Sequence, residues 1–368
     1  MARPAFSLDF GILSDKFRPM ILSFVFPSSS QRAGGVAMLF EFANAMARRG
    51  HEVHFIHGPA LATRVDRVED IPYDFDARVI HHITDTLDDP ALPSAQIVFN
   101  DHTPRRLGQP VAIVQGFRLI GPAWDRAVFR APCPKVCVAS WLVDVGLAYG
   151  VPPEQLVHVP MGMDHELFAV RTPRSPRTFD VAMLYHPWYE KGWDIGRDIL
   201  GELARRRSNF RAVVFSLAGP PPEPLPPGVE LKLDLDQRRL ADEVYNATRV
   251  FVQSSRHEGF GLTAIEAMAC GAALVTTDCG GSRDYAFTDS TAVVVPPGDS
   301  GALTAAVDSL LDDPERADNL AAAGADSVRK FDWSRSAEEL ERFLLRYLED
   351  PPRFQRASGE DRSEEYAL

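Results

Sequence analysis

The sequence predicts an α/β protein made of two similar units, each a parallel sheet flanked by helices, that face each other across a cleft. Three observations lead to this fold class. Short apolar runs alternate with amphipathic helical stretches, which is typical of β-α-β units. The alternation stops at the proline-rich stretch RTPRSPRT (171–178) and then starts again. The length of 368 residues is also consistent with about two domains.

The first unit is expected over residues 1–170. Its first strand is the apolar run MILSFVF (20–26), followed by a polar loop with Gly34-Gly35 and a helical stretch that Gly50 ends. Four more apolar runs predict further strands: EVHFIH (52–57), QIVF (96–99), VAIV (111–114) and VCVA (136–139).

The second unit is expected over residues 171–350. Its last helix, SAEELERFLLRYLED, is also considered as packing back on the first unit. Residues 351–368 are polar and are expected to form a flexible tail. Six apolar runs predict the strands: DVAMLY (180–185), AVVFSLAG (212–219), VELKLDL (229–235), RVFVQSS (249–255), ALVTTD (273–278) and AVVVP (292–296).

Composition and charge limit the class of function. The net charge of −12 argues against nucleic acid as the main partner, because phosphate contacts need an excess of Lys and Arg. The N-terminal stretch lacks the apolar core of a signal peptide, and no apolar run approaches the ~20 residues of a membrane span. Four cysteines are too few for a disulfide framework in a chain of this size. We therefore expect a cytoplasmic protein with at most peripheral membrane contact.

The stretch HEGFGLTAIEAM (257–268) follows the predicted strand RVFVQSS and allows three interpretations. Glu258 and Glu266 lie on either side of a glycine-rich turn and the start of an apolar helix. One interpretation is a capping box, in which Thr263 begins the helix and Glu266 bonds back to its first amides. It leaves Glu258 and both glycines unexplained.

A second interpretation is a dinucleotide-binding turn. Gly259-x-Gly261-x-x-Ala264 fits the G-x-G-x-x-A pattern, and Asp278 ends the next strand, where a ribose-binding acid would lie. That fingerprint normally follows the first strand of its domain, whereas several predicted strands of the same half precede it here.

A third interpretation uses every residue of the stretch. Glycines let backbone amides approach a polar ligand closely, and a helix start favours negative charge. Carboxylates on both sides of the turn can accept hydrogen bonds from two sets of sugar hydroxyls. A nucleotide sugar offers both sets, a hexose at one end and a ribose at the other, with a diphosphate between them.

The stretch resembles the E-x7-E motif of the family four retaining glycosyltransferases, also described as glycosyl transferases group 1. The resemblance implies the GT-B fold, in which two Rossmann-like domains face each other, the first binding the acceptor and the second the nucleotide-sugar donor. The order and spacing of the shared motifs are specific, and they extend over nearly the whole chain: the Gly-Gly loop, VPMGMDHELF (159–168), YEKG (189–192), TDCGGSRDY (277–285) and VVVPPGD (293–299).

The resemblance also implies roles for individual residues. Glu258 would bind hydroxyls of the transferred sugar, Glu266 would bind the ribose, and Lys191 would pair with the diphosphate. Gly35, after the first strand, would lie near the leaving phosphate. The glycine turn would line the sugar and phosphate, with Gly259, Phe260, Gly261 and Leu262 as its residues.

Two positions depart from the family pattern. His186 stands where the family commonly has an arginine, and Gln115 stands where it often has a histidine near the reacting sugar. A histidine lacks the fixed charge and the bidentate geometry of an arginine. His186 stays a candidate for donor binding, and His102, in FNDHT, is the neighbouring candidate for a catalytic role.

The implied function is transfer of a hexose, with retention of configuration, from a nucleotide-diphosphate sugar to a saccharide, lipid-linked or small-molecule acceptor. Lys191 and backbone amides would stabilise the leaving diphosphate, so neither a metal nor a cofactor besides the donor substrate is expected. Arginine-rich composition is compatible with a bacterial glycoconjugate or natural-product pathway. Three rivals stay open: a metal-dependent GT-A enzyme with an Asp-x-Asp match (74–76 or 234–236), a sugar-nucleotide epimerase, and a non-catalytic sugar-nucleotide-binding protein.

Overall fold

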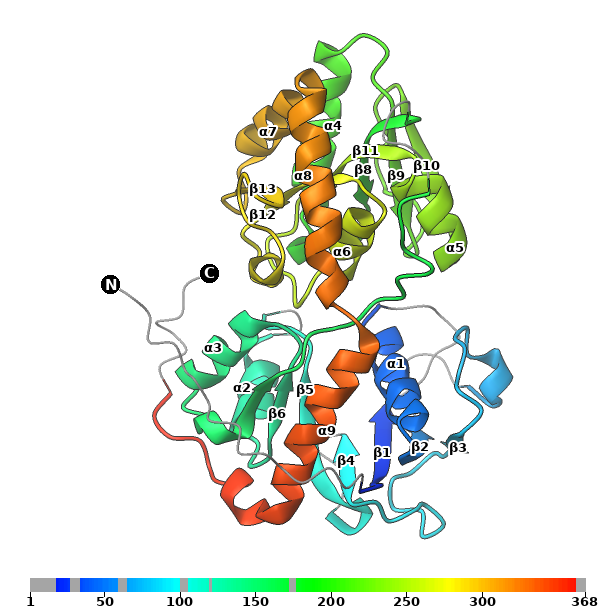
Figure 1. Cartoon of the computed structure of the whole chain (residues 1–368), viewed down its shortest axis with the longest axis vertical. Helices are drawn as coiled ribbons and strands as arrows, with labels where there is room; N and C mark the ends of the chain where they lie inside the picture. The colour runs from blue at the N-terminus through cyan, green and yellow to red at the C-terminus, as the bar shows by residue number, and fades with distance from the viewer. Residues whose placement is uncertain are drawn as a thin grey trace.

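The computed structural model describes residues 18–26, 34–58, 65–99, 105–118, 121–171 and 177–361. Within these ranges the chain forms two parallel sheets, each with helices packed on it, one unit above the other in Figure 1. The predicted α/β class with two Rossmann-like units is therefore confirmed. In the part of the chain that is described, no helix is long and apolar enough to cross a membrane.

The first unit holds a seven-stranded sheet in the order β3-β2-β1-β4-β5-β6-β7. Its helices are α1 (Gly34–Arg48), α2 (Pro122–Arg130) and α3 (Ser140–Ala148). The strands are β1 (Ile21–Phe26), β2 (Glu52–His57), β3 (Val79–Ile83), β4 (Ile97–Phe99), β5 (Gln109–Val114), β6 (Lys135–Cys137) and β7 (Leu156–His158).

The sequence analysis did not predict two strands of this sheet. β3, with the sequence VIHHI, and β7, with only three residues, form the two edges of the sheet. An edge strand is covered less than a central one, so it needs no continuous apolar run. The strands that the sequence did predict here are the more deeply buried ones, such as β1 and β2.

The second unit holds a six-stranded sheet in the order β10-β9-β8-β11-β12-β13. Its strands are β8 (Phe179–Leu184), β9 (Ala212–Ser216), β10 (Val229–Leu233), β11 (Thr248–Gln253), β12 (Ala273–Thr277) and β13 (Ala292–Val295). Its helices are α4 (Trp193–Arg206), α5 (Gln237–Leu240), a π-helical turn (Ala241–Tyr245), α6 (Leu262–Ala269), α7 (Ser300–Asp312) and α8 (Pro314–Ser327). The strand order changes direction between β8 and β11, and ligands of such sheets bind outside the carboxyl ends of the strands at this point.

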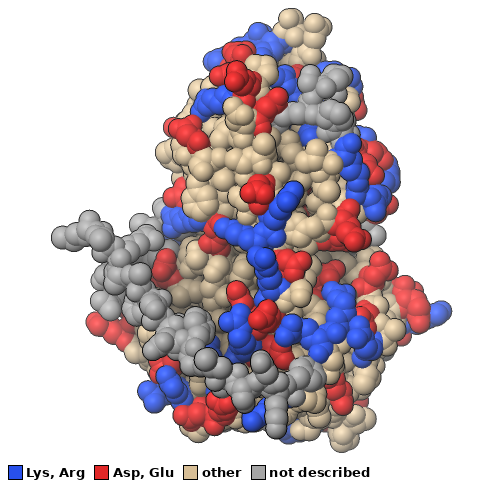
Figure 2. Space-filling view, viewed as in Figure 1, with Lys and Arg blue, Asp and Glu red and all other residues tan. Residues whose placement is uncertain are grey.

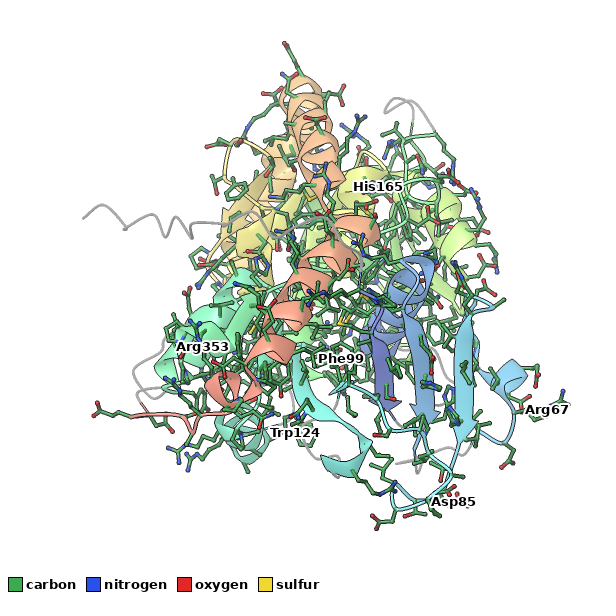
Figure 3. All side chains as sticks on the ribbon, turned by 60° about the horizontal axis from the view of Figure 1, so that its bottom comes forward. Arg67, Asp85, Phe99, Trp124, His165 and Arg353 are labelled. Atoms are coloured by element: carbon green, nitrogen blue, oxygen red, sulfur yellow. The ribbon has the colours of Figure 1, made fainter. Side chains whose placement is uncertain are left out.

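The last helix, α9 (Trp333–Glu349), leaves the second unit and lies across the first, as Figures 1 and 3 show from two directions. It packs against α1, and its Glu341 pairs with Arg49 beyond the end of that helix. Ser336 Oγ donates to the carbonyl of Pro160 at 2.7 Å. The end of the chain thus ties the two units together.

The segment expected to be a flexible tail is packed as far as it is described, so this expectation is corrected for residues 351–361. Phe354 is buried against α9, with its ring 5.8 Å from that of Phe343. Farther on, the Gly359 amide donates to the carbonyl of Gly150 at 2.7 Å. Apolar Phe354 explains the packing. Residues 362–368 lie outside the described part.

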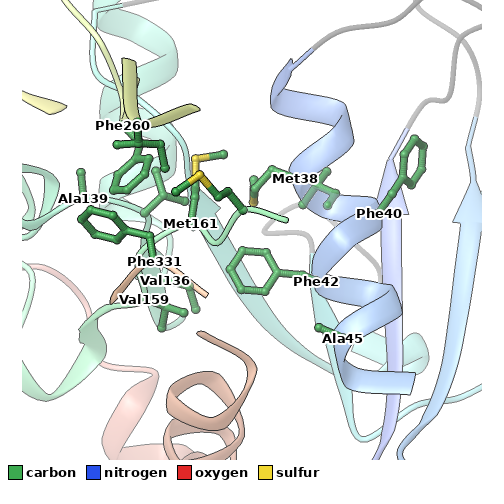
Figure 4. Packing of buried hydrophobic residues seen from close by; sticks show 14 of the residues in the cluster. Met38, Phe40, Phe42, Ala45, Val136, Ala139, Val159, Met161, Phe260 and Phe331 are labelled. Carbon is green, nitrogen blue, oxygen red and sulfur yellow. The ribbon is translucent and has the colours of Figure 1, made fainter. Parts of the chain in front are cut away.

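One cluster of buried apolar residues extends through both units, and two smaller clusters lie within one unit each. The extended cluster includes Phe42 of α1, Met161 of the connection, and Phe260 and Phe331 of the second unit. Figure 4 shows Phe42 on α1 across from Met161, Phe260 and Phe331. The four cysteines are buried free thiols. On the surface, Figure 2 shows acidic and basic side chains interspersed rather than gathered into a face of one sign.

Candidate functional site

Lys191 and Glu258 meet at the carboxyl ends of β8 and β11. Lys191 ends the 3₁₀ turn Tyr189–Lys191 that follows β8, and Glu258 follows β11. The Lys191 Nζ lies 2.8 Å from both carboxylate oxygens of Glu258. Ser255 Oγ donates to the same carboxylate at 2.8 Å. Only 8% of the Glu258 side chain is exposed, so this ion pair is largely shielded from water.

A glycine and an arginine fix the turn that carries Lys191. Gly192 has φ 65°, and a Cβ there would lie 2.1 Å from the Ser254 carbonyl oxygen, so only glycine allows the turn to approach β11 this closely. Arg256 forms a bidentate pair with Asp194 (2.8 and 2.6 Å) and stacks on the Tyr189 ring at 3.9 Å. Arg256 therefore stabilises the turn that carries Lys191.

The glycine turn touches the first unit. A Cβ on Gly259 would lie 1.7 Å from the carbonyl oxygen of Gln115, and its own carbonyl accepts from Trp141 Nε1 at 2.8 Å. Gly261 has φ 96°, with Tyr285 and Gln253 closely behind it. Both positions therefore require glycine, the first for the junction between the units and the second for its backbone conformation.

Phe260 and Leu262 complete this turn. The Phe260 ring is buried, with its centroid 5.1 Å from that of Phe331, so the side chain belongs to the core between the units. Leu262 is the first residue of α6, so its amide has no partner within the helix. The start of α6 therefore presents backbone donors beside Lys191 and Glu258.

Glu266 lies within α6, where it is buried and accepts a hydrogen bond from the Tyr245 hydroxyl at 3.0 Å. Burial raises the pKa of Glu266 to about 7. The capping-box interpretation is wrong, because α6 begins at Leu262, its N-cap is Gly261, and no side chain caps it. Glu266 faces the π-helical turn and not the helix start.

His186 lies close to the ion pair but carries no permanent charge. Its Nδ1 accepts a hydrogen bond from the Trp188 amide at 3.2 Å. Partial burial lowers the pKa of His186, and the Lys191 charge lowers it further. At neutral pH the imidazole is therefore uncharged and cannot act as the fixed cation that an arginine would provide.

In the first unit, Gln115 lies between two glycines. A Cβ on Gly35, near the start of α1, would lie 2.6 Å from Gln115 Oε1, while the Gln115 carbonyl contacts Gly259. The structure thus brings Gly35 and Gly259 to opposite sides of one residue. His102 lies outside the described residues.

Gln253 is a residue that the sequence analysis missed. It is the last residue of β11, it is buried, and its Oε1 accepts from Thr276 Oγ1 at 2.8 Å and from the Tyr285 hydroxyl at 3.3 Å. Among the described residues, its Nε2 has no hydrogen-bond partner. Gln253 lines a cavity of about 10 Å³ together with Lys191, Ser255, Glu258 and Thr263. In the sequence, a polar residue at the end of an otherwise apolar strand could have indicated that Gln253 belongs to the site.

The residues behind the rival interpretations have other roles. Asp278, the supposed ribose acid of a dinucleotide site, pairs with Arg283 at 2.6 and 3.0 Å. In the two Asp-x-Asp matches, Asp76 pairs with Arg78 and Asp236 caps α5 by accepting from the Arg239 amide. In the described ranges, no three His, Cys, Asp or Glu side chains are grouped as metal ligands would be.

Comparison with known sequences points to one family. Residues 225–327 match the family described as Glycosyl transferases group 1. The chain is 31% identical to a glycogen synthase of Mycobacterium tuberculosis over 221 residues, 54% of this chain and 50% of that protein. It is 30% identical to a D-inositol 3-phosphate glycosyltransferase of Kineococcus radiotolerans over 282 residues, 66% of this chain and 62% of that protein. The chain thus spans about half to three fifths of these relatives.

Solved structures share the fold over almost the whole chain. A sucrose-phosphate synthase from Thermosynechococcus elongatus has a TM-score of 0.70 at 17% identity, covering 91% of this chain and 100% of that one. Anabaena HepE, in complex with UDP-glucose, has a TM-score of 0.70 at 14% identity, covering 89% and 100%. Residues 225–327 of the second unit thus resemble the glycosyl transferases group 1 family, and the two units together have the GT-B fold.

Proposed function

We propose that this chain is a retaining glycosyltransferase that moves a hexose from a nucleoside diphosphate sugar to an acceptor hydroxyl in bacterial glycoconjugate or natural-product synthesis. The observation that carries the proposal is the shielded Lys191–Glu258 pair beside the start of α6. A cation next to helix amides suits a diphosphate, and a carboxylate suits sugar hydroxyls. The turn that follows Glu258 faces the first unit, from which the acceptor would approach.

Lys191, the start of α6 and Glu258 have different roles in the proposed reaction. As the bond from sugar to phosphate breaks, negative charge grows on the diphosphate, and Lys191 Nζ with the first amides of α6 stabilises it. One such preorganised donor contributes roughly 2.7–4 kcal/mol to lowering a barrier. Glu258 holds hydroxyls of the transferred sugar, so Lys191 gives up part of its contact with Glu258 when the diphosphate binds. We assign no general base, and the leaving phosphate accepts the proton of the acceptor hydroxyl.

Glu266 would bind the ribose hydroxyls. In the ionised form it can accept two hydroxyl hydrogen bonds beside the bond from Tyr245. Because burial raises its pKa to about 7, this ability depends on pH in the physiological range. Names of similar proteins support the substrate class: one structure holds UDP-glucose, another of the same protein holds UDP and glucose, and the sequence relatives include sugar transferases and synthases.

Ligand binding and turnover test the proposal and its rivals. A thermal-shift screen against UDP, GDP, ADP and their sugars should show stabilisation by one nucleotide series, because a ligand of the folded state raises its stability. The best donor is then incubated with and without candidate acceptors. Conversion to another nucleotide sugar without acceptor would establish an epimerase. Binding without any turnover would establish a non-catalytic protein, and no binding at all would refute the proposal.

Two further measurements test the finer claims. Product NMR should show the donor's anomeric configuration, and an inverted product would refute retention. Activity should survive prolonged EDTA treatment, because Lys191 and helix amides are proposed to offset the phosphate charge. Loss that Mg²⁺ or Mn²⁺ restores would show that a metal is needed.

A further inference from the structure

Arg118 has an unfavourable backbone conformation in the loop that follows β5, three residues after Gln115. Among the described non-glycine residues, four have a left-handed φ, and three of these are Asn or Asp, which tolerate it. Arg118, with φ 61°, is the fourth. Its amide donates to Asp125 Oδ2 at 3.1 Å, and Asp125 is buried in the first turn of α2. A buried carboxylate therefore holds this arginine in a conformation that its side chain disfavours.

The Arg118 side chain forms no ion pair among the described residues, although its charge, like its amide, opposes the rise in the pKa of Asp125 that burial causes. Its guanidinium is exposed and lies 5.2 Å from the Phe117 ring, and within the described ranges no carboxylate is close enough to form an ion pair with it. Three other cations of the strand-end region form ion pairs: Lys191 with Glu258, Arg256 with Asp194, and Arg283 with Asp278.

The loop with Arg118 faces the strand-end segment of the second unit. Gln115 contacts Gly259, and the positive charge of Arg118 acts on His257, the residue before Glu258. After burial, this charge is the strongest influence that lowers the pKa of His257, while the Glu190 carboxylate acts in the opposite direction. His257 is therefore neutral at pH 7 and places no second positive charge beside Arg118.

We propose that Arg118 is an anion-binding residue that the first unit contributes to the cleft, where it binds a phosphate group of the ligand. This rests on the proposed function. The phosphate belongs either to the donor diphosphate or to a phosphorylated acceptor. An arginine binds phosphate with a planar, bidentate fork, and the left-handed backbone is kept because it directs that fork into the cleft. It would supply the fixed charge that neutral His186 lacks.

Calorimetry on the full chain tests this proposal with three probes: inorganic pyrophosphate, the nucleoside diphosphate that binds best, and a sugar monophosphate compared with the free sugar. The variants are Arg118→Ala, Arg118→Lys and Arg118→Gly. Arg126→Ala is the matched control, because Arg126 is also exposed, lies on α2 of the same unit, and has no ion pair among the described residues. Arg118→Ala should weaken phosphate binding roughly 10- to 100-fold, and Arg118→Lys should weaken it less.

Arg118→Gly separates function from folding. Glycine adopts φ 61° without penalty, so this variant should melt at or above the wild-type temperature and still lose phosphate affinity. Loss confined to pyrophosphate and nucleoside diphosphate assigns Arg118 to the donor, and loss confined to the sugar phosphate assigns it to the acceptor. If all three variants match Arg126→Ala with every probe, the proposal is overturned. Should wild-type protein bind no nucleoside diphosphate, the proposed function fails, while the other two probes still decide the role of Arg118.

Discussion

The two glutamates of HEGFGLTAIEAM lie in very different surroundings. Glu258, at a strand end, receives both a lysine and a serine and is part of an ion pair. Glu266, inside α6, receives one neutral tyrosine hydroxyl, and burial raises its pKa to about 7. The same residue type, within one short motif, therefore forms an ion pair at one end and, at the other, accepts a neutral hydroxyl and has a raised pKa.

The partners explain this difference. The lysine of Glu258 lies 67 positions earlier in the chain, on the turn after β8, and the tyrosine of Glu266 lies 21 positions earlier, on the π-helical turn. The motif itself fixes only the spacing of the two carboxylates. The hydrogen-bond partners of each carboxylate depend on which other elements of the second unit lie beside it.

Lys191→Ala should have the largest effect. Turnover should fall roughly 100- to 1,000-fold, because the leaving diphosphate loses its cation. The melting temperature should also fall, since the shielded Glu258 carboxylate then keeps Ser255 as its one side-chain donor among the described residues. Donor assays and thermal melts measure the two effects.

The double variant Lys191→Ala/Glu258→Gln separates them. Replacing the uncompensated carboxylate by an amide should restore much of the melting temperature and none of the turnover. Glu258→Gln alone should bind bare nucleoside diphosphate normally and turn the intact donor over more slowly. Near-normal turnover in Lys191→Ala would remove this lysine from the mechanism.

Gly259→Ala should cause the next largest effect, on the turn between the two glutamates. Its Cβ would lie 1.7 Å from the Gln115 carbonyl oxygen, so the two units must move apart locally. The free energy of unfolding should fall by about 1–3 kcal/mol, as for an overpacked site. Gly201→Ala is the control: Gly201 lies on α4 with open space around it, and alanine there should stabilise by up to about 1 kcal/mol. Equal urea midpoints for the two variants would contradict the close junction.

Glu266→Gln should remove a pH dependence. With a pKa of about 7, Glu266 is mostly protonated at pH 6 and mostly ionised at pH 8, so wild-type nucleoside diphosphate affinity should fall roughly tenfold between pH 8 and pH 6. Titration of the phosphate adds its own pH dependence to both proteins, so the quantity to compare is the ratio of wild-type to Glu266→Gln affinity. A ratio that stays constant with pH would show that Glu266 does not contact the ligand.

Stability should respond with the opposite sign. The pKa of Glu266 is raised in the folded protein above its ordinary value, so its contribution to stability is fully present below that value and is lost as the pH rises through about 7. Between pH 5 and pH 8, wild type should therefore lose stability relative to Glu266→Gln. Melting curves of the two proteins across this range measure the difference.

The sequence predicted those features that depend on local pattern. Apolar runs located the buried strands, and the E-x7-E motif placed Glu258 at the end of β11. The sequence analysis did not predict the edge strands β3 and β7, nor did it predict that segment 351–361 is packed against the rest of the chain. These segments are stabilised by contacts with distant parts of the chain. Such contacts cannot be predicted from local patterns in a single sequence.

The residues of the site divide in the same way. Short motifs that indicate a chemical role contain Lys191, Gly259 and Gly261. No such motif contains Gln253 or Tyr245. Tyr245 takes part only because a π-helical turn brings it beside α6. The capping-box interpretation failed for the same reason: S/T-x-x-E is a local pattern, and the buried tyrosine that donates to Glu266 lies on another element.

Tyr245→Phe should have the smallest effect, and it tests what sets the pKa of Glu266. The variant removes one hydrogen bond between buried groups, so the free energy of unfolding should fall by about 0.5–1.5 kcal/mol. That hydrogen bond lowers the pKa of Glu266 against the effect of burial, so its loss should raise the pKa above about 7. The midpoint of the pH-dependent nucleotide affinity should then move to higher pH. Tyr149→Phe, a buried tyrosine of the first unit, is the control and should leave the midpoint unchanged. An unshifted midpoint in Tyr245→Phe would mean that burial alone raises the pKa of Glu266, and that its tyrosine does not contribute to the difference from Glu258.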